Sequence, residues 1–400
     1  MEIDASTEGA CTGSGSKEEA MVDEESVAEE FAETTESAEP GALSKAVSAV
    51  GKAASAMGRG VGSAYRVTAE NRHYLNAVLC GFLGDRLAEA GDPKAISMSF
   101  RQGGSDVGVE ELALPSKLQS AGRTLVVTIH GLMCDEVMFD ETRWQSTSPS
   151  RPGHGLRLER ELGVTVLHVR YNTGLHISEN GRRLSALLEE LVAAAVPHLD
   201  RLILVAHSMG GLVARSAGYY GSLDGHEWVK RLSTVVLLGV PAQGSYLEQL
   251  ANLSAFVLQR VGNLYTTLGG RIIEQRSNGI RDLRFGFMVD EDWRDHSKDG
   301  RLRAVRTHIP TISGVDYHLL VGTLASDESS PVALYFGDGL VGKRSALGTD
   351  PFRMTDPSAA CGSYRVFPST GHFDILTSPE VGEHVVNLVR QAMERTPRPL

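Results

Sequence analysis

Apolar positions in the middle of the chain fall into two patterns, short continuous runs and longer stretches with helical spacing. Short runs rich in β-branched residues predict buried strands, whereas apolar residues three and four positions apart predict helices. Strands are expected at residues 124–129, 164–169, 201–205, 234–238 and 364–367, and helices at 181–196 and from 212 onward. This alternation predicts an α/β fold whose mostly parallel sheet carries helices on both faces.

The alternation fails between residues 245 and 307, where an apolar, helix-like stretch is followed by a charged one. An insertion of this kind predicts a helical cap over the site, where a substrate binds. Leu253, Phe256 and Val257 are candidate contacts for an apolar substrate, although they could equally bury the cap against the body. The body itself is expected to span residues 121–395.

The first 120 residues predict two appendages. Residues 1–40 contain thirteen acidic residues and one lysine, with few bulky apolar residues, so we expect a disordered tail. This tail either keeps the protein soluble or serves as a docking segment. Residues 41–120 predict a helical extension, with a helix at 75–90 and short strands at 95–100 and 107–112. A weakly amphipathic stretch at 44–67 either contacts a membrane surface or packs as a linker.

One serine stands where an apolar run passes directly into a helix, in the sequence Ala206-His207-Ser208-Met209-Gly210-Gly211. A serine on a sharp strand-to-helix turn is typical of a nucleophile elbow, and the small residues around it permit so tight a turn. Ser208 is therefore the candidate nucleophile, with His207 and Gly210 supporting the elbow.

A serine nucleophile requires a general base and an acid that orients the base. His372 follows the last predicted strand, and Asp338 lies between two glycines in a predicted loop. The chain order serine, acid, histidine is the one this elbow requires. Asp316 and Asp327 compete for the role of the acid, but neither has flanking glycines.

An oxyanion hole is expected from the loop after residues 124–129. The backbone N–H groups of Leu132 and Met209 are the candidate donors, since fixed N–H groups stabilise the anion that forms during acyl transfer. Gly131 lets the backbone approach closely, and His130 is expected to support the loop structurally.

Several motifs together resemble the lipase and esterase branch of the α/β-hydrolases, above all bacterial relatives of the GPI inositol-deacylase-like group. They are Ile129-His130-Gly131-Leu132, Arg170-Tyr171-Asn172-Thr173-Gly174, Ala206 to Gly211, Leu238-Gly239-Val240-Pro241, Gly337-Asp338-Gly339-Leu340-Val341 and Gly371-His372-Phe373-Asp374. The resemblance implies an α/β-hydrolase fold and ester hydrolysis without a metal or organic cofactor. Many relatives carry a histidine after the Val-Pro pair, where this chain has Ala242, which leaves substrate choice open.

Composition fits this interpretation. The net charge of −11 comes from the acidic tail, because residues 41–400 carry 38 basic and 37 acidic residues. A nearly neutral body predicts no nucleic-acid partner. With four widely spaced cysteines, no apolar leader and no membrane-length apolar run, the sequence predicts a cytoplasmic protein.

The sequence as a whole predicts a serine hydrolase of carboxylic esters, with a small-molecule or lipid-like substrate. An acyltransferase with the same triad is the enzymatic alternative, and a non-catalytic interaction protein of the same fold is another. The oligomeric state and the alcohol and acyl parts of the substrate stay open.

Overall fold

A computed structural model describes residues 72–112, 123–140, 151–195, 199–241, 276–299, 306–326 and 362–396. Its central feature is an eight-stranded sheet with the order β2-β1-β4-β3-β5-β6-β7-β8. The two strands at one edge pair antiparallel and all later strands pair parallel. The strands are β1 (Ser99–Gln102), β2 (Ser105–Val107), β3 (Thr124–Ile129), β4 (Thr165–Arg170), β5 (Arg201–His207), β6 (Leu232–Leu238), β7 (Asp316–Gly322) and β8 (Ser363–Phe367).

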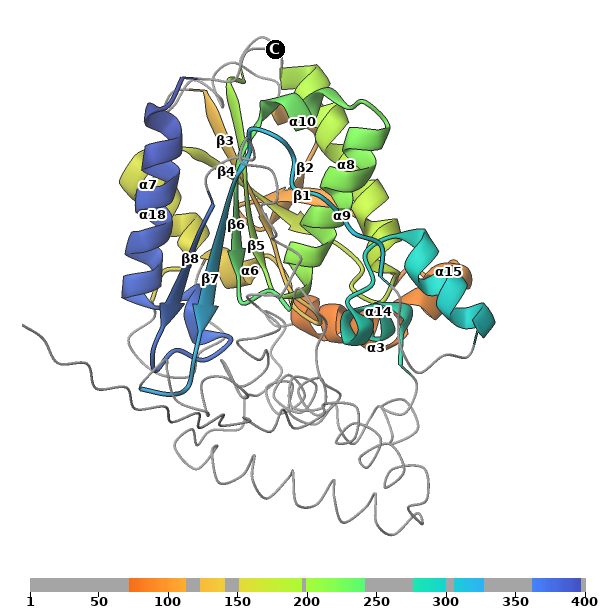
Figure 1. The fold of residues 1–400 in the computed structure, drawn as a ribbon. Coiled ribbons are helices and arrows are strands. Elements are labelled where there is room, and N and C mark those ends of the chain that lie inside the picture. The colour runs from red at the N-terminus through yellow and green to blue at the C-terminus, as the bar shows by residue number, and fades with distance from the viewer. Residues whose placement is uncertain are drawn as a thin grey trace, which may run out of the picture. The chain divides into compact units, whose positions relative to one another are not determined.

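Helices cover both faces of the sheet (Figure 1). On one face α7 (His154–Leu162) packs against α18 (Pro379–Glu394), and Arg157 Nη1 donates to Pro379 O at 3.0 Å between them. On the other face lie α8 (Ile177–Ala195), α9 (Met209–Leu223) and α10 (Glu227–Arg231). Every residue of β3 and β5 is buried, which explains their continuous apolar sequences.

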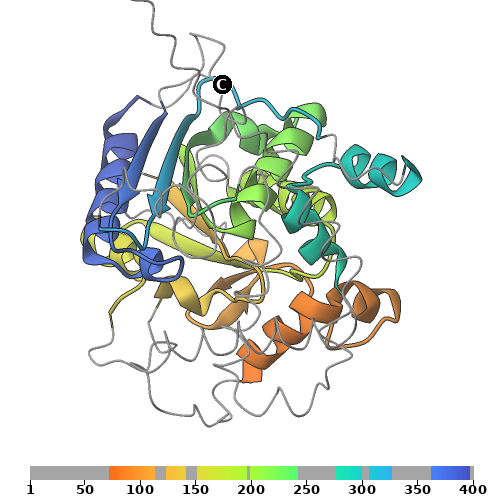
Figure 2. The ribbon, with the colours of Figure 1, turned by 60° about the horizontal axis from the view of Figure 1, so that its bottom comes forward.

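The remaining described elements are α3 (Arg72–Glu89), α4 (Val109–Leu112), α6 (Val137–Asp140), α14 (Asn278–Phe285), α15 (Asp290–Asp299) and the 3-10 helix η3 (Asp374–Leu376). Helices α3 and α14 pack side by side near the carboxyl ends of the strands, the end that Figure 2 turns towards the viewer. Thus α14, in the segment predicted as a cap, contacts both α3 and α8.

The expectation of a strand at residues 107–112 is wrong. Gly103 and Gly104 both have positive φ, 57° and 81°, and close a two-residue hairpin between β1 and β2. Strand β2 ends at Val107, and residues 109–112 form α4, whose first turn carries Glu110 and Glu111. The strand predicted at residues 95–100 is also displaced, since β1 begins at Ser99 and ends at Gln102.

Several predicted features lie outside the described residues. They are the acidic tail, the stretch at 44–67, most of the cap with Leu253, Phe256 and Val257, and the loops of Asp327 and Asp338. Of the helices described, none has the length and apolar character needed to cross a membrane.

Candidate active site

The candidate nucleophile lies where β5 passes into α9. Ser208 has φ 53° and ψ −126°, a backbone conformation that a residue with a side chain rarely adopts. Its N–H donates to Leu238 O at 2.9 Å, and its own carbonyl accepts from Gly211 N–H at 3.0 Å. The structure thus holds this serine in a strained turn between two anchored elements, the geometry of a nucleophile elbow.

The turn is so tight that α9 begins directly against the end of β3. A Cβ added to Gly210 would lie 2.5 Å from the carbonyl oxygens of both Ile129 and His130. Neither oxygen can move without disturbing the central strand, so this position requires glycine. The elbow and the end of β3 are therefore packed as one unit.

The loop after β3 reaches the elbow through Gly131. A Cβ added to Gly131 would meet Ser208 Cβ at 3.0 Å and His207 Nδ1 at 3.2 Å. The predicted oxyanion loop and the candidate nucleophile therefore lie so close that a side chain at position 131 would crowd Ser208. Leu132 follows in the same loop and is buried. Met209 opens α9, where backbone N–H groups have no acceptor within the helix.

Two side chains from the segment after β4 hold this loop in place. Tyr171 donates its hydroxyl to His130 O at 2.8 Å, and its ring stacks on the His130 imidazole at a centroid distance of 4.4 Å. Thr173 Oγ1 accepts the N–H of Met133, which has a positive φ of 58°. His130 is buried, and burial lowers the pKa of its imidazole.

Tyr171 and Thr173 belong to a motif of the sequence for which no role was predicted. Nothing local to their sequence shows that they contact the loop after β3, because the contact spans about forty residues. The adjacency of β3 and β4 in the sheet creates it.

The candidate base lies beside the elbow. His372 follows β8, is buried, and lies with its ring centroid 4.7 Å from that of His207. His207 Nε2 is 3.0 Å from His372 O. Since β5 and β8 run parallel, Ser208 and His372 both lie at the carboxyl ends of the strands. The structure therefore brings together the elbow, the loop of His130 to Leu132 and the His372 loop.

Of the three candidate acids, Asp316 alone lies within the described residues. Asp338 and Asp327 lie outside the described residues, whereas Asp316 is the first residue of β7 and pairs with Arg395. Because β5 and β7 are parallel, Asp316 at the amino end of β7 lies at the opposite end of the strands from Ser208, which follows the carboxyl end of β5. Asp316 is thus excluded as the orienting acid.

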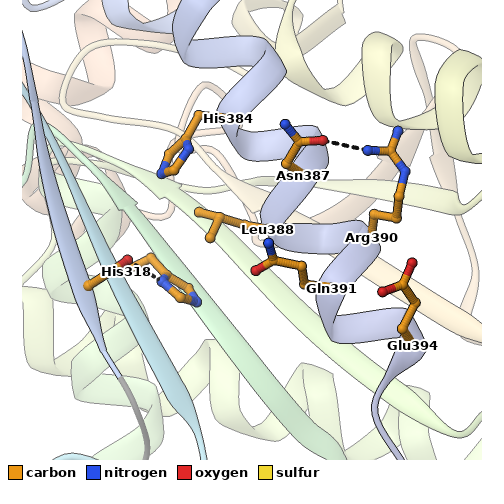
Figure 3. Close-up of a pocket in the computed structure, with 8 residues that line it drawn as sticks. His318, His384, Asn387, Leu388, Arg390, Gln391 and Glu394 are labelled. Atoms are coloured by element: carbon orange, nitrogen blue, oxygen red, sulfur yellow. Dashed lines mark hydrogen bonds between the residues drawn. The ribbon is translucent and has the colours of Figure 1, made fainter.

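A cavity of about 480 Å³ lies between β7, β8 and α18 (Figure 3). His318 and His384 project into it, and His318 Nδ1 is 2.8 Å from Ser363 Oγ. Burial, together with the nearby His384, lowers the pKa of His318 to about 4. Ser363 opens β8, so this cavity lies at the opposite end of that strand from His372. It is therefore separate from the candidate active site.

Comparison with known proteins agrees with this architecture. Residues 126–381 match the model of the alpha/beta hydrolase family. The chain belongs to that family. No curated protein matches it. In the described ranges, no three His, Cys, Asp or Glu side chains are arranged to hold a metal ion.

Solved structures with a similar fold include two named for hydrolysis of esters. The mature lipase BlEst2 of Bacillus licheniformis is 20% identical, with a TM-score of 0.41, covering 68% of this chain and 92% of the lipase. An esterase of Pyrococcus furiosus is 15% identical, with a TM-score of 0.40, covering 68% of this chain and 83% of its own.

Proposed function

We propose that this protein is a serine hydrolase that cleaves carboxylic esters through an acyl-enzyme. The observation that carries the proposal is the close approach of Gly131, in the loop after β3, to Ser208 in its strained turn. Acyl transfer requires backbone N–H donors close to the nucleophile.

In the proposed mechanism Ser208 Oγ attacks the ester carbonyl while His372 accepts its proton and then passes it to the leaving alcohol. The N–H groups of Leu132 and Met209 stabilise the oxyanion. Asp338 stays ionised and fixes the imidazole tautomer. Water then attacks the acyl-enzyme by the same route and releases the acid.

Hydrolysis of p-nitrophenyl butyrate tests this proposal. Parent activity should be lost in Ser208→Ala, whose melting temperature should stay close to the parent's. Ser222→Ala is the matched control, since Ser222 also lies on α9 and donates only to Gly218 O of its own helix. Equal activity in parent and Ser208→Ala would refute the serine mechanism.

We further propose that the ester is lipid-like, because the segment expected to form the cap contains an apolar stretch at residues 247–268. Leu253, Phe256 and Val257 would then bind the acyl chain. Each buried methylene contributes about 0.8 kcal/mol, so kcat/KM should rise about fourfold per carbon until the binding surface ends. Phe256→Ser should flatten this slope and leave acetyl-ester turnover unchanged. A parent enzyme that prefers acetyl over octanoyl esters would point to a short-chain esterase.

An acyltransferase is the second candidate, because the same motifs and the same loop could transfer the acyl group to an alcohol in place of water. Product analysis in the presence of competing alcohols separates the two. Free acid as the dominant product supports the hydrolase, and dominant transfer to the alcohol supports the transferase.

A further inference from the structure

The loop that carries His372 is a short, internally bonded turn. Gly371 O accepts from Ile375 N–H at 3.1 Å, and Gly371 N–H donates to Asp374 Oδ2 at 3.2 Å. These bonds fix the shape of the loop. They do not fix its position relative to Ser208, which depends on contacts with other elements.

One such contact comes from the elbow itself. His207 Nε2 lies 3.0 Å from His372 O, and the opposite edge of the same ring faces the backbone of Gly131. The His207 side chain is 1% exposed. A single imidazole therefore lies between the loop after β3 and the loop after β8.

A second contact comes from α7, the helix on the other face of the sheet. His154 is the first residue of α7, and its Nε2 lies 2.7 Å from Ile375 O. His154 is also 1% exposed. The loop is thus bonded near both ends, at His372 by β5 and at Ile375 by α7.

Both contacts fix the chemical form of the histidine. A carbonyl oxygen can only accept, so Nε2 must carry the proton in each ring. Among the described residues, Nδ1 of His154 and Nδ1 of His207 are buried and have no hydrogen-bond partner. Burial lowers the pKa of both groups, that of His154 to about 4. Each side chain supplies an N–H donor without a charge.

The absence of charge matters for the neighbouring base. In the proposed mechanism His372 becomes an imidazolium, and a lysine or arginine holding the loop would repel that charge. A buried neutral imidazole bonds the loop with no such penalty. It also costs less conformational entropy than a long flexible side chain would.

We propose that His154 and His207 are positioning residues that hold the His372 loop in register with Ser208. This inference rests on the proposed function for its catalytic consequence. Both histidines bond the loop through its backbone carbonyls. A displacement of the base by about 1 Å can cost about 10²-fold in rate, so loss of either bond should lower turnover.

The test uses the full chain and two substitutions at His154, which lies away from the elbow. His154→Leu removes the donor, whereas His154→Gln places an amide N–H near the position of Nε2. We expect kcat for p-nitrophenyl butyrate to fall about 10²-fold in the leucine variant, with KM changed little, and to recover largely in the glutamine variant. His207→Gln and His207→Leu should follow the same order.

Hydrogen exchange supplies a measure that does not depend on activity. Backbone amides of residues 371–376 should exchange faster in His154→Leu than in the parent and in His154→Gln. His226→Leu is the control, because His226 bonds Ser185 elsewhere in the body and should leave both that exchange and kcat unchanged.

Unchanged exchange at 371–376 in His154→Leu, or parental kcat despite faster exchange, would overturn the proposal. Equal loss of kcat in the leucine and glutamine variants would also overturn it. A parent inert towards esters would instead remove the proposed function, and the exchange experiment would still decide whether His154 holds the loop.

Discussion

At the scale of single residues, the site depends on positions where backbone meets backbone. The sequence predicted the elbow because its small residues are consecutive and follow an apolar run. It could not predict which atoms those small residues contact. Gly210 faces the carbonyl oxygens of Ile129 and His130 at the end of β3, some eighty residues earlier in the chain.

We expect Gly210→Ala to lower the free energy of unfolding by about 1–3 kcal/mol, because the added methyl group would overlap backbone that cannot move. Gly108→Ala is the control, since a Cβ there meets no atom within 4 Å. Urea unfolding of both variants checks this. Equal stability of the two variants would contradict the close packing of α9 on β3.

The orienting acid gives a second residue-scale prediction. Asp338→Asn should lower kcat by a factor on the order of 10⁴, as loss of the correct imidazole tautomer does. Asp316→Asn should leave kcat unchanged and reduce thermal stability, since Asp316 pairs with Arg395 at the far edge of the sheet. Steady-state kinetics and melting curves of both variants test this prediction. A larger loss of kcat in Asp316→Asn than in Asp338→Asn would show that Asp338 is not the orienting acid.

At the scale of elements, most strands were predictable because burial on both faces makes their sequences continuously apolar. Strand β7 was not predicted, since it begins with Asp316, Tyr317 and His318 and its sequence is not continuously apolar. The hairpin β1–β2 was misjudged because Gly103 and Gly104, both with positive φ, turn the chain directly after β1, so β2 begins and ends earlier than predicted. Contacts between elements, such as Tyr171 with His130, have no local signal.

Helix α3 was predicted as part of an N-terminal extension, and the structure makes it part of the body. Val78 and Phe82 are buried in the core, and Gly84 O accepts from Asn172 Nδ2 at 2.8 Å. Asp85 Oδ2 accepts from Asn278 N–H at 3.0 Å. The helix thus connects the segment after β4 with α14.

We expect removal of residues 1–40 to leave ester hydrolysis unchanged, and removal of residues 1–90 to prevent folding, because the second truncation exposes the core beneath α3. Phe82→Ala is a milder variant and should cost about 3–5 kcal/mol of unfolding free energy. Circular dichroism and denaturant unfolding provide the measurement. An unfolding free energy of Phe82→Ala equal to the parent's would contradict the packing of α3 on the core.

At the scale of the whole molecule, the described part contains several buried or half-buried histidines whose pKa values are lowered by the loss of solvent around them. They are His130, His154, His207 and His318. The unfolded chain therefore binds protons that the folded chain rejects as the pH falls below about 6.5. Stability should decrease from there towards pH 4. The raised pKa of buried Asp282 acts in the opposite sense.

His154 allows this to be measured at one position. Its pKa, lowered from 6.5 to about 4, corresponds to at most about 3 kcal/mol of stability lost between those pH values. His154→Gln keeps the donor but cannot titrate, so its free energy of unfolding should fall less than the parent's on acidification. Urea unfolding at pH 7 and pH 4.5 gives both values. Identical pH dependence would show that His154 is not held neutral in the folded protein.

The central claim is that Ser208 is a nucleophile, and covalent labelling tests it most directly. A fluorophosphonate reacts with a serine whose hydroxyl is activated by a neighbouring base. Mass spectrometry of the digested parent should locate one adduct on the peptide containing Ser208, and Ser208→Ala should carry none under the same conditions. An adduct on a different residue, or equal labelling of Ser208→Ala, would contradict the account.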